Sequence, residues 1–232
     1  AIDLNTENVL KVEVEDTLDK DLPYGKQTKK PGGMWYTPVS GIWQTVWLES
    51  MPADAIDNLI ITPTLDSVTI KTVGGASHKT LVFENEEYSF SDTITIDIEN
   101  PLHWTPDTPH LYDFCVKSGE DTVYSYFALR TVDIGEKDGK PYILLNGKPY
   151  YFHGLLDQGY FSDGIYLPAT ADGFKNDILK MKECGFNMLR KHIKLEPDLF
   201  YYYCDKYGMA VFQDFINNGR YDFIIDTAIP TV

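Results

Sequence analysis

Apolar and polar residues alternate along much of the first 135 positions of this chain. A period of two is typical of half-buried β-strands. It is clear at 9–14 and 41–49, but these two segments are too few for a sandwich, so we expect them to need partner strands from outside the chain or from the next domain. Six further short segments, separated by turn residues, predict an immunoglobulin-like β-sandwich over 52–136. These predicted strands are 58–64, 67–73, 79–84, 93–98, 111–117 and 122–129.

From position 139 the pattern changes to strands that alternate with helices. An Asn146-Gly147 pair predicts a hairpin turn between strands 142–145 and 149–155. Two helices with apolar residues at helical spacing follow, each before a further strand. The helices are 170–184, which Thr170 can cap and Gly185 ends, and 197–207, which Gly208 ends; the strands are 186–192 and 209–215.

This order of elements implies parallel crossover connections and predicts the first three strands of a TIM (β/α)8 barrel over 137–232. A complete barrel of this kind needs roughly 250 residues. We therefore expect the rest of the barrel to be missing from this chain.

The composition is that of a folded globular protein, with 43% apolar and 14% aromatic residues among 232. The net charge of −15 argues against nucleic acid and membrane surfaces as partners. Cys115, Cys184 and Cys204 are far apart and are interpreted as reduced core residues, not as a disulfide framework or zinc site. No apolar run is long enough to span a membrane. The first residues do not resemble a signal peptide, and a cytoplasmic and a secreted or periplasmic bacterial location both stay open.

Candidate chemistry gathers at the C-terminal ends of the predicted parallel strands, where barrel enzymes carry their active residues. The polar residues at these ends are candidates for substrate binding: Asp157, Gln158, Arg190, His192 and Asp214. Aromatic residues nearby could wall a sugar pocket: Tyr160, Phe161, Tyr166 and Phe212. A structural interpretation stays open, because Arg190 could simply pair with Asp157 or Asp214, and His192 could be a hydrogen-bonded structural residue. Nucleotide-binding, zinc-protease and serine-hydrolase motifs are absent, and the histidines lack metal-ligand spacing, so no metal site is predicted.

Three groups of motifs, in order along the chain, resemble glycoside hydrolase family two, which includes β-galactosidases, β-glucuronidases and β-mannosidases. Residues 41–49, Gly-Ile-Trp-Gln-Thr-Val-Trp-Leu-Glu, resemble the closing strand of that family's sugar-binding jelly-roll domain. Residues 101–112 and 127–132 resemble the signature of its central immunoglobulin-like domain and the strand that leaves it. Several segments resemble the start of its catalytic barrel: 144–149, 177–182, 185–190 and 204–208.

The resemblance implies a multidomain β plus α/β protein, part of a retaining exo-β-glycosidase, with β-galactosidase-like hydrolysis of O-glycosidic bonds in carbohydrates favoured. The implied domains are the end of a jelly-roll β-sandwich (1–51), an immunoglobulin-like β-sandwich (52–136) and a truncated TIM barrel (137–232). Retaining hydrolysis uses two carboxylates about 5–5.5 Å apart. In the family these are glutamates on later barrel strands, so we expect no catalytic residue in this chain and both glutamates downstream.

Arg190 matches the family's arginine on the second barrel strand, near the sugar site. The implied partner is a carbohydrate substrate, and a homo-oligomer is left open. No cofactor is expected; a divalent metal occurs in the family, but no ligand set for one is visible here.

Three departures from the family leave the sugar open. Ala128 stands where the family has Gly in the motif that leaves the sandwich. Residues 153–158 read His-Gly-Leu-Leu-Asp-Gln where the family often has Arg-Gly before a loop with Asn or His, and 191–194 read Lys-His-Ile-Lys in place of Ser-His-Tyr-Pro. A non-catalytic carbohydrate-binding or accessory fragment is the alternative, and an immunoglobulin-like adhesion module is disfavoured by the strand–helix tail. Three parallel strands would leave unpaired edges, so the chain alone is expected to aggregate or to be held by other chains.

Overall fold

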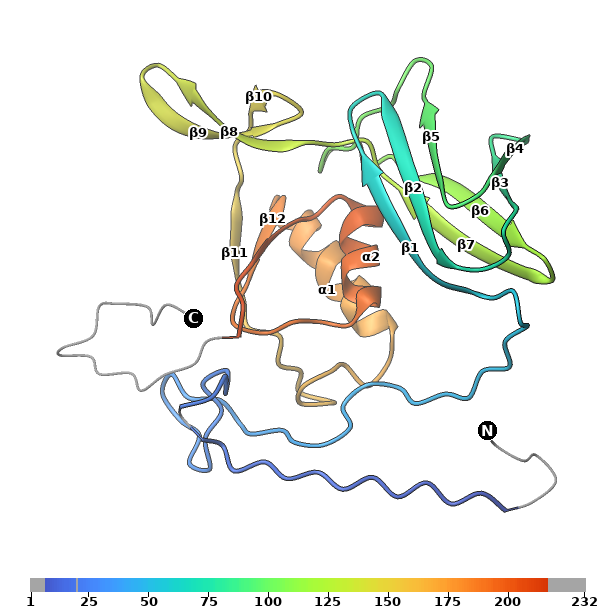
Figure 1. Ribbon diagram of the computed structural model, residues 1–232. Helices are drawn as coiled ribbons and strands as arrows, with labels where there is room; N and C mark the ends of the chain where they lie inside the picture. Colours follow the sequence, from blue (N-terminus) through green and yellow to red (C-terminus); the bar gives the residue numbers. More distant parts are fainter. Residues whose placement is uncertain (1–6, 20, 217–232) are drawn as a thin grey trace.

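The computed structural model describes residues 7–19 and 21–216, and it contains a β-sandwich, a projecting hairpin and a parallel sheet with two helices (Figure 1). The sandwich strands are β1 (Ile56–Pro63), β2 (Ser67–Gly74), β3 (Lys79–Phe83), β4 (Glu86–Phe90), β5 (Thr93–Asp97), β6 (Tyr112–Ser118) and β7 (Asp121–Phe127). The hairpin holds β8 (Val132–Lys137), β9 (Lys140–Leu145) and β10 (Lys148–Pro149). The last unit holds β11 (Gly154–Asp157), α1 (Asp172–Glu183), β12 (Met188–Lys191), α2 (Asp198–Tyr207) and β13 (Ala210–Gln213).

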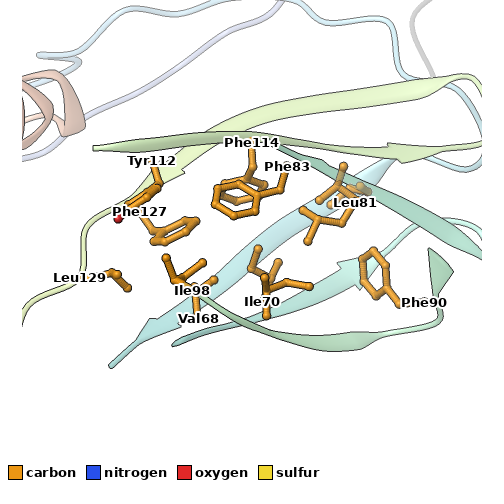
Figure 2. Packing of buried hydrophobic residues seen from close by; sticks show 13 residues of the cluster. Val68, Ile70, Leu81, Phe83, Phe90, Ile98, Tyr112, Phe114, Phe127 and Leu129 are labelled. Carbon is orange, nitrogen blue, oxygen red and sulfur yellow. The ribbon is translucent and has the colours of Figure 1, made fainter. Parts of the chain in front are cut away.

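The sandwich consists of two antiparallel sheets, ordered β1-β2-β5 and β4-β3-β6-β7. Alternate side chains of each strand point into the space between the sheets. In β6, for example, Tyr112, Phe114 and Val116 are buried, whereas the residues between them are not. The rings of Phe83, Tyr112 and Phe127 lie 5.1–6.0 Å apart inside this core (Figure 2). Burial of this apolar surface is the main force that holds the two sheets together.

All six strands predicted for this region are confirmed, with ends that differ by at most two residues. The prediction lacks β4, which lies in the interval between the predicted strands 79–84 and 93–98 that was assigned to turn residues. The turn itself lies at Glu84 and Asn85, whose φ angles are 50° and 65°. The chain then returns and pairs with β3 as an antiparallel strand.

The predicted hairpin turn at Asn146-Gly147 is confirmed, since both residues have positive φ, 53° and 71°. The predicted second arm, 149–155, is mostly wrong. Only β10 pairs with β9, because the chain then leaves the hairpin and joins a different, parallel sheet as β11. β8, which pairs with β9 along its length, was not predicted as a strand.

The predicted strand–helix–strand–helix–strand unit is confirmed, and its sheet is parallel in the order β11-β12-β13. Its core contains Phe174 and Ile178 of α1, Leu189 of β12 and Phe200 of α2. Gly185 and Gly208 follow the two helices with φ of 86° and 76°, as the helix-ending role requires.

Two predictions in this unit are wrong. Helix α1 begins after Ala171, and no side chain caps it, so the expected cap by Thr170 does not form. The thiol of Cys184 is exposed at the end of α1, whereas Cys204 is buried and Cys115 is half-buried; all three are free.

The predicted strands at 9–14 and 41–49 are not strands in the structure. A strand needs a partner for its backbone groups, and no described residue supplies one to either segment. Their apolar side chains are therefore largely exposed, Val9 by 84% and Trp47 by 73%. The backbone of this region runs past the parallel sheet without joining it (Figure 1). Its pairing is limited to isolated bridges, such as Gln27 with Tyr36.

Candidate functional site

The polar residues of the parallel strands divide between the two faces of the sheet. Successive side chains of a strand point to opposite faces. In β12, Leu189 and Lys191 are buried on the face that carries the helices, and Arg190 between them is exposed on the other face. The candidates predicted from the strand ends therefore fall into two separate groups.

The first group consists of Arg190, His192 and Asp214, which the structure brings together. Nε and Nη2 of Arg190 donate to the two carboxylate oxygens of Asp214 at 3.1 and 3.0 Å. The Nδ1 atom of His192 lies 3.0 Å from Oδ2 of the same carboxylate. A paired fork of this kind fixes the guanidinium plane as well as its distance.

This group keeps Asp214 ionised. Burial pushes the pKa of the Asp214 carboxyl upward, but hydrogen bonds from Arg190 and His192 outweigh it, so this pKa lies below its ordinary value of 3.8. The carboxylate therefore stays an acceptor for both partners at neutral pH.

A segment far away in the sequence lies against the same strand ends. Nζ of Lys26 is 3.3 Å from Nε2 of His192, and the ring of Tyr36 meets the His192 ring edge-on at 6.4 Å. Tyr36 also stacks on Tyr160 at 4.9 Å, and the Tyr160 hydroxyl donates to the carbonyl of Thr37. These contacts make an aromatic wall beside His192.

Of the four aromatic residues predicted to line the site, Tyr160 and Tyr166 lie in this wall. Tyr166 meets Tyr160 edge-on at 5.8 Å, and Trp43 meets Tyr166 at 5.3 Å. Phe161 packs instead against Phe174 of α1, in the helix-side core. Phe212 packs against Phe152. The candidate Gln158 is exposed and lines a small hollow together with Tyr36, His192 and Tyr160.

The second group lies on the helix side and contains the remaining candidate, Asp157. Its Oδ2 atom accepts from Nζ of Lys191 at 3.0 Å, and its Oδ1 atom accepts from the backbone N–H of Gly159. Lys191 also pairs with Glu196 at 2.5 Å, and Lys194 pairs with the same Glu196 oxygen at 2.9 Å. Asp157 is thus held among buried charges and does not join Arg190.

The site residues predicted from the sequence do not include Lys191, Lys194 or Glu196. Charged residues are almost never fully buried unless they are paired. The available signal was strand alternation: because Arg190 was predicted at a strand end, Lys191 next to it must face the other side. Alternation alone could not reveal Glu196, which lies beyond the strand.

The described residues do not fit a divalent metal, because no three carboxylate, histidine or cysteine side chains among them converge on one point. Within residues 7–19 and 21–216, neither helix is long and apolar enough to cross a bilayer.

The architecture is thus a β-sandwich joined to an α/β unit whose polar strand ends form the candidate site. Residues 53–130 match the family model of glycosyl hydrolases family 2. The chain is 28% identical to a β-galactosidase of Thermoanaerobacter pseudethanolicus over 90% of its own length and 31% of the relative. It is 30% identical to a β-galactosidase of Pseudoalteromonas haloplanktis over 77% of its own length and 20% of the relative. The resemblance to this family is therefore confirmed.

Solved structures agree with this assignment at the level of the fold. The β-glucuronidase 3 of Bacteroides uniformis superposes with a TM-score of 0.63 over 73% of this chain and 24% of that one, at 21% identity. A β-glucuronidase of Faecalibacterium prausnitzii gives 0.59 over 67% and 27%, at 23% identity. The chain thus spans about a third or less of the proteins that it resembles.

Proposed function

We propose that this chain is part of a retaining exo-β-glycosidase, with β-galactosidase-like specificity favoured, and that it supplies the sugar-binding rim of the catalytic barrel. In this proposal residues 1–51 end a jelly-roll domain, 52–136 form an immunoglobulin-like sandwich and 137–232 begin a TIM barrel. The observation that carries it is the fixed group of Arg190, His192 and Asp214 at the C-terminal strand edge, in a chain similar to proteins named β-galactosidase.

In retaining hydrolysis a carboxylic acid protonates the departing oxygen, a second carboxylate forms a glycosyl-enzyme, and water then releases the sugar. The proposal puts both carboxylates outside this chain and gives the chain the task of positioning. Asp214 engages Nε and Nη2 of Arg190. Among the described residues, Nη1 of Arg190 has no hydrogen-bond partner, so it is left to bind a sugar hydroxyl or to orient a catalytic carboxylate.

His192 would also help to position the sugar, because Asp214 contacts it as well. A lysine ammonium only donates hydrogen bonds, so the contact with Lys26 assigns Nε2 of His192 as an acceptor and Nδ1–H as the donor to Asp214. The ring of His192 is then held in one orientation between Asp214 and Lys26. A sugar hydroxyl that replaces Lys26 at Nε2 would meet a fixed acceptor.

The test is hydrolysis of aryl β-galactoside, β-glucuronide, β-mannoside and β-glucoside substrates by this chain and by the longer protein that completes the barrel. We expect activity only in the longer protein, with the preferred substrate identifying the sugar. In that protein, Arg190→Ala should lower kcat/KM by roughly 10²-fold, since displaced positioning groups cost about that much. Arg190→Lys should restore little, because an ammonium cannot replace the two-pronged contact.

Lys180→Ala is the matched control, since it removes an exposed cation from α1. Activity of the 232-residue chain itself would refute the proposed division of labour. Full activity of Arg190→Ala in the longer protein would refute the role of Arg190. A longer protein that binds sugars and hydrolyses none of them would favour a carbohydrate-binding module instead.

A further inference from the structure

Four charged side chains lie together beneath the strand ends: the half-buried Asp157 and the buried Lys191, Lys194 and Glu196. The side chain of Glu196 is fully buried, and those of Lys191 and Lys194 nearly so. Nζ of Lys191 also lies 4.5 Å from the centre of the Phe200 ring, inside the helix-side core. The two cations and two anions balance, which is the condition for burying such groups at a tolerable cost.

Lys194 does more than balance charge, because it holds both ends of one loop. Its Nζ atom donates to the carbonyl of Gly159 at 2.6 Å and to the carbonyl of Tyr166. The ammonium also lies 4.2 Å from the centre of the Tyr166 ring. The segment 159–166 is thus closed on itself around a single buried cation.

The loop approaches the charged cluster so closely that only glycine fits at its first position. A Cβ atom on Gly159 would lie 2.6 Å from Oε1 of Glu196 and 2.8 Å from Nζ of Lys191. Gly159 also has a φ of 68°, which other residues rarely adopt. Backbone and buried charges are therefore in direct contact along the edge of the site.

What the cluster holds is the wall of the candidate sugar site. The loop carries Tyr160, which stacks on Tyr36 beside His192, and Tyr166 at its other end. Asp157, which the cluster anchors through Lys191, also accepts the backbone N–H of His192 on its carbonyl. Any shift of the cluster would therefore move the groups that face the substrate.

We propose that Lys191, Lys194 and Glu196 are positioning residues, a buried clamp that fixes the 159–166 loop and Asp157 so that Tyr160 and His192 face a bound sugar. This inference rests on the proposed glycosidase function. The clamp does not touch the substrate. Its effect should appear in substrate binding, and therefore in KM more than in kcat.

The decisive comparison uses Lys194→Met and the double variant Lys194→Met/Glu196→Gln in the longer protein. Lys194→Met removes the loop contacts and leaves the cluster with one excess negative charge. The double variant restores neutrality but still lacks the ammonium that binds the two carbonyls. We expect Lys194→Met to lower the thermal midpoint, to speed amide hydrogen exchange in 159–166 and to raise KM about tenfold or more, in keeping with the cost of misplaced positioning groups.

The double variant should recover the thermal midpoint, while the exchange and the KM stay raised. If the double variant recovered KM and amide hydrogen exchange as well as the thermal midpoint, the proposal would be overturned, because charge balance alone would then explain the cluster. The proposal would also be overturned if Lys194→Met showed the same amide hydrogen exchange and the same KM as the exposed control Lys180→Met. If the longer protein hydrolyses none of the glycosides, the proposed function fails, but the hydrogen-exchange comparison still decides whether the clamp holds the loop.

A second pair of variants guards against misfolding of Lys194→Met. Gly159→Ala keeps every charge but forces a methyl group against Glu196 and Lys191, whereas Gly139→Ala has a similar φ of 71° and nothing within 4 Å of the added atom. We expect Gly159→Ala to raise KM and loop exchange, and Gly139→Ala to leave both unchanged. Equal behaviour of the two variants would contradict the proposed contact.

Discussion

Loss of the Asp205 carboxylate should loosen the joint between the sandwich and helix α2. Asp205 lies on α2, and its carboxylate accepts from Nη1 of Arg130 at 2.6 Å and from the Tyr126 hydroxyl at 3.0 Å. Its backbone carbonyl accepts from the indole N–H of Trp104 at 2.7 Å, and the guanidinium of Arg130 lies over the Trp104 ring at 4.5 Å. Three residues from the sandwich side therefore converge on one helical residue.

The expected coupling free energy between Arg130 and Asp205 depends on how far their side chains are buried. Exposed ion pairs contribute roughly 0.2–1 kcal/mol, whereas a hydrogen bond to a charged group contributes about 1.5–3 kcal/mol when water is largely excluded. The side chains of Arg130 and Asp205 are 34% and 21% exposed, between these limits. We therefore expect a coupling free energy of about 1–2 kcal/mol from a double-mutant cycle of Arg130→Met and Asp205→Asn. The pair of Lys117 and Glu87, whose side chains are 49% and 60% exposed, should give a clearly smaller coupling, because solvent screens it.

Trp104 provides the assay, because its buried indole contacts both partners. Replacing Trp35, Trp43 and Trp47 with phenylalanine leaves Trp104 as the single tryptophan, and its fluorescence during urea unfolding then reports the joint. The same cycle on Lys117→Met and Glu87→Gln is the matched control. A coupling for Arg130 and Asp205 no larger than that of the exposed pair would refute the argument from burial.

Two further predictions concern pH and self-association. The pKa of Asp214 is lowered below its unfolded value of 3.8, so the stabilising effect of this carboxylate should be fully present above about pH 4 and lost as the pH falls through the folded pKa. Asp214→Asn should therefore lower the thermal midpoint at pH 7 but not in strong acid. A change in midpoint that is independent of pH would contradict this. The chain alone should self-associate as its concentration rises, which light scattering would measure. Among the described residues β13 pairs on only one side, and Ile134 on the hairpin is 85% exposed. A monodisperse monomer at all concentrations would contradict this.

The sandwich and the parallel unit could be predicted because the sequence pattern of each element agrees with the way that the element packs in the fold. Strands such as β6 alternate in burial as they alternate in sequence, and Gly208 both ends α2 and packs against the carbonyl of Pro106. The segments at 9–14 and 41–49 have the same alternation but no partner among the described residues. Alternation reports which side chains could be buried, and the pairing that makes a strand depends on residues elsewhere.

The candidate site could be predicted only in part, for a related reason. The position of Arg190, His192 and Asp214 at strand ends was enough to bring them together, because parallel strands end at the same edge. The buried cluster could not be read in this way, because a buried lysine is stable only beside partners from other segments. Lys194 obtains those partners from a loop about 30 residues earlier, in Gly159 and Tyr166.

The two faces of β12 carry two different sets of ion pairs. Arg190 faces the open side of the sheet, where Asp214 fixes it, and its neighbour Lys191 faces the helices, where Asp157 and Glu196 hold it. Because the two side chains share one short piece of backbone, a displacement of Lys191 would also move Arg190. Under the proposed function, a change in the buried charges should therefore alter sugar binding through Arg190, without a direct contact to the sugar.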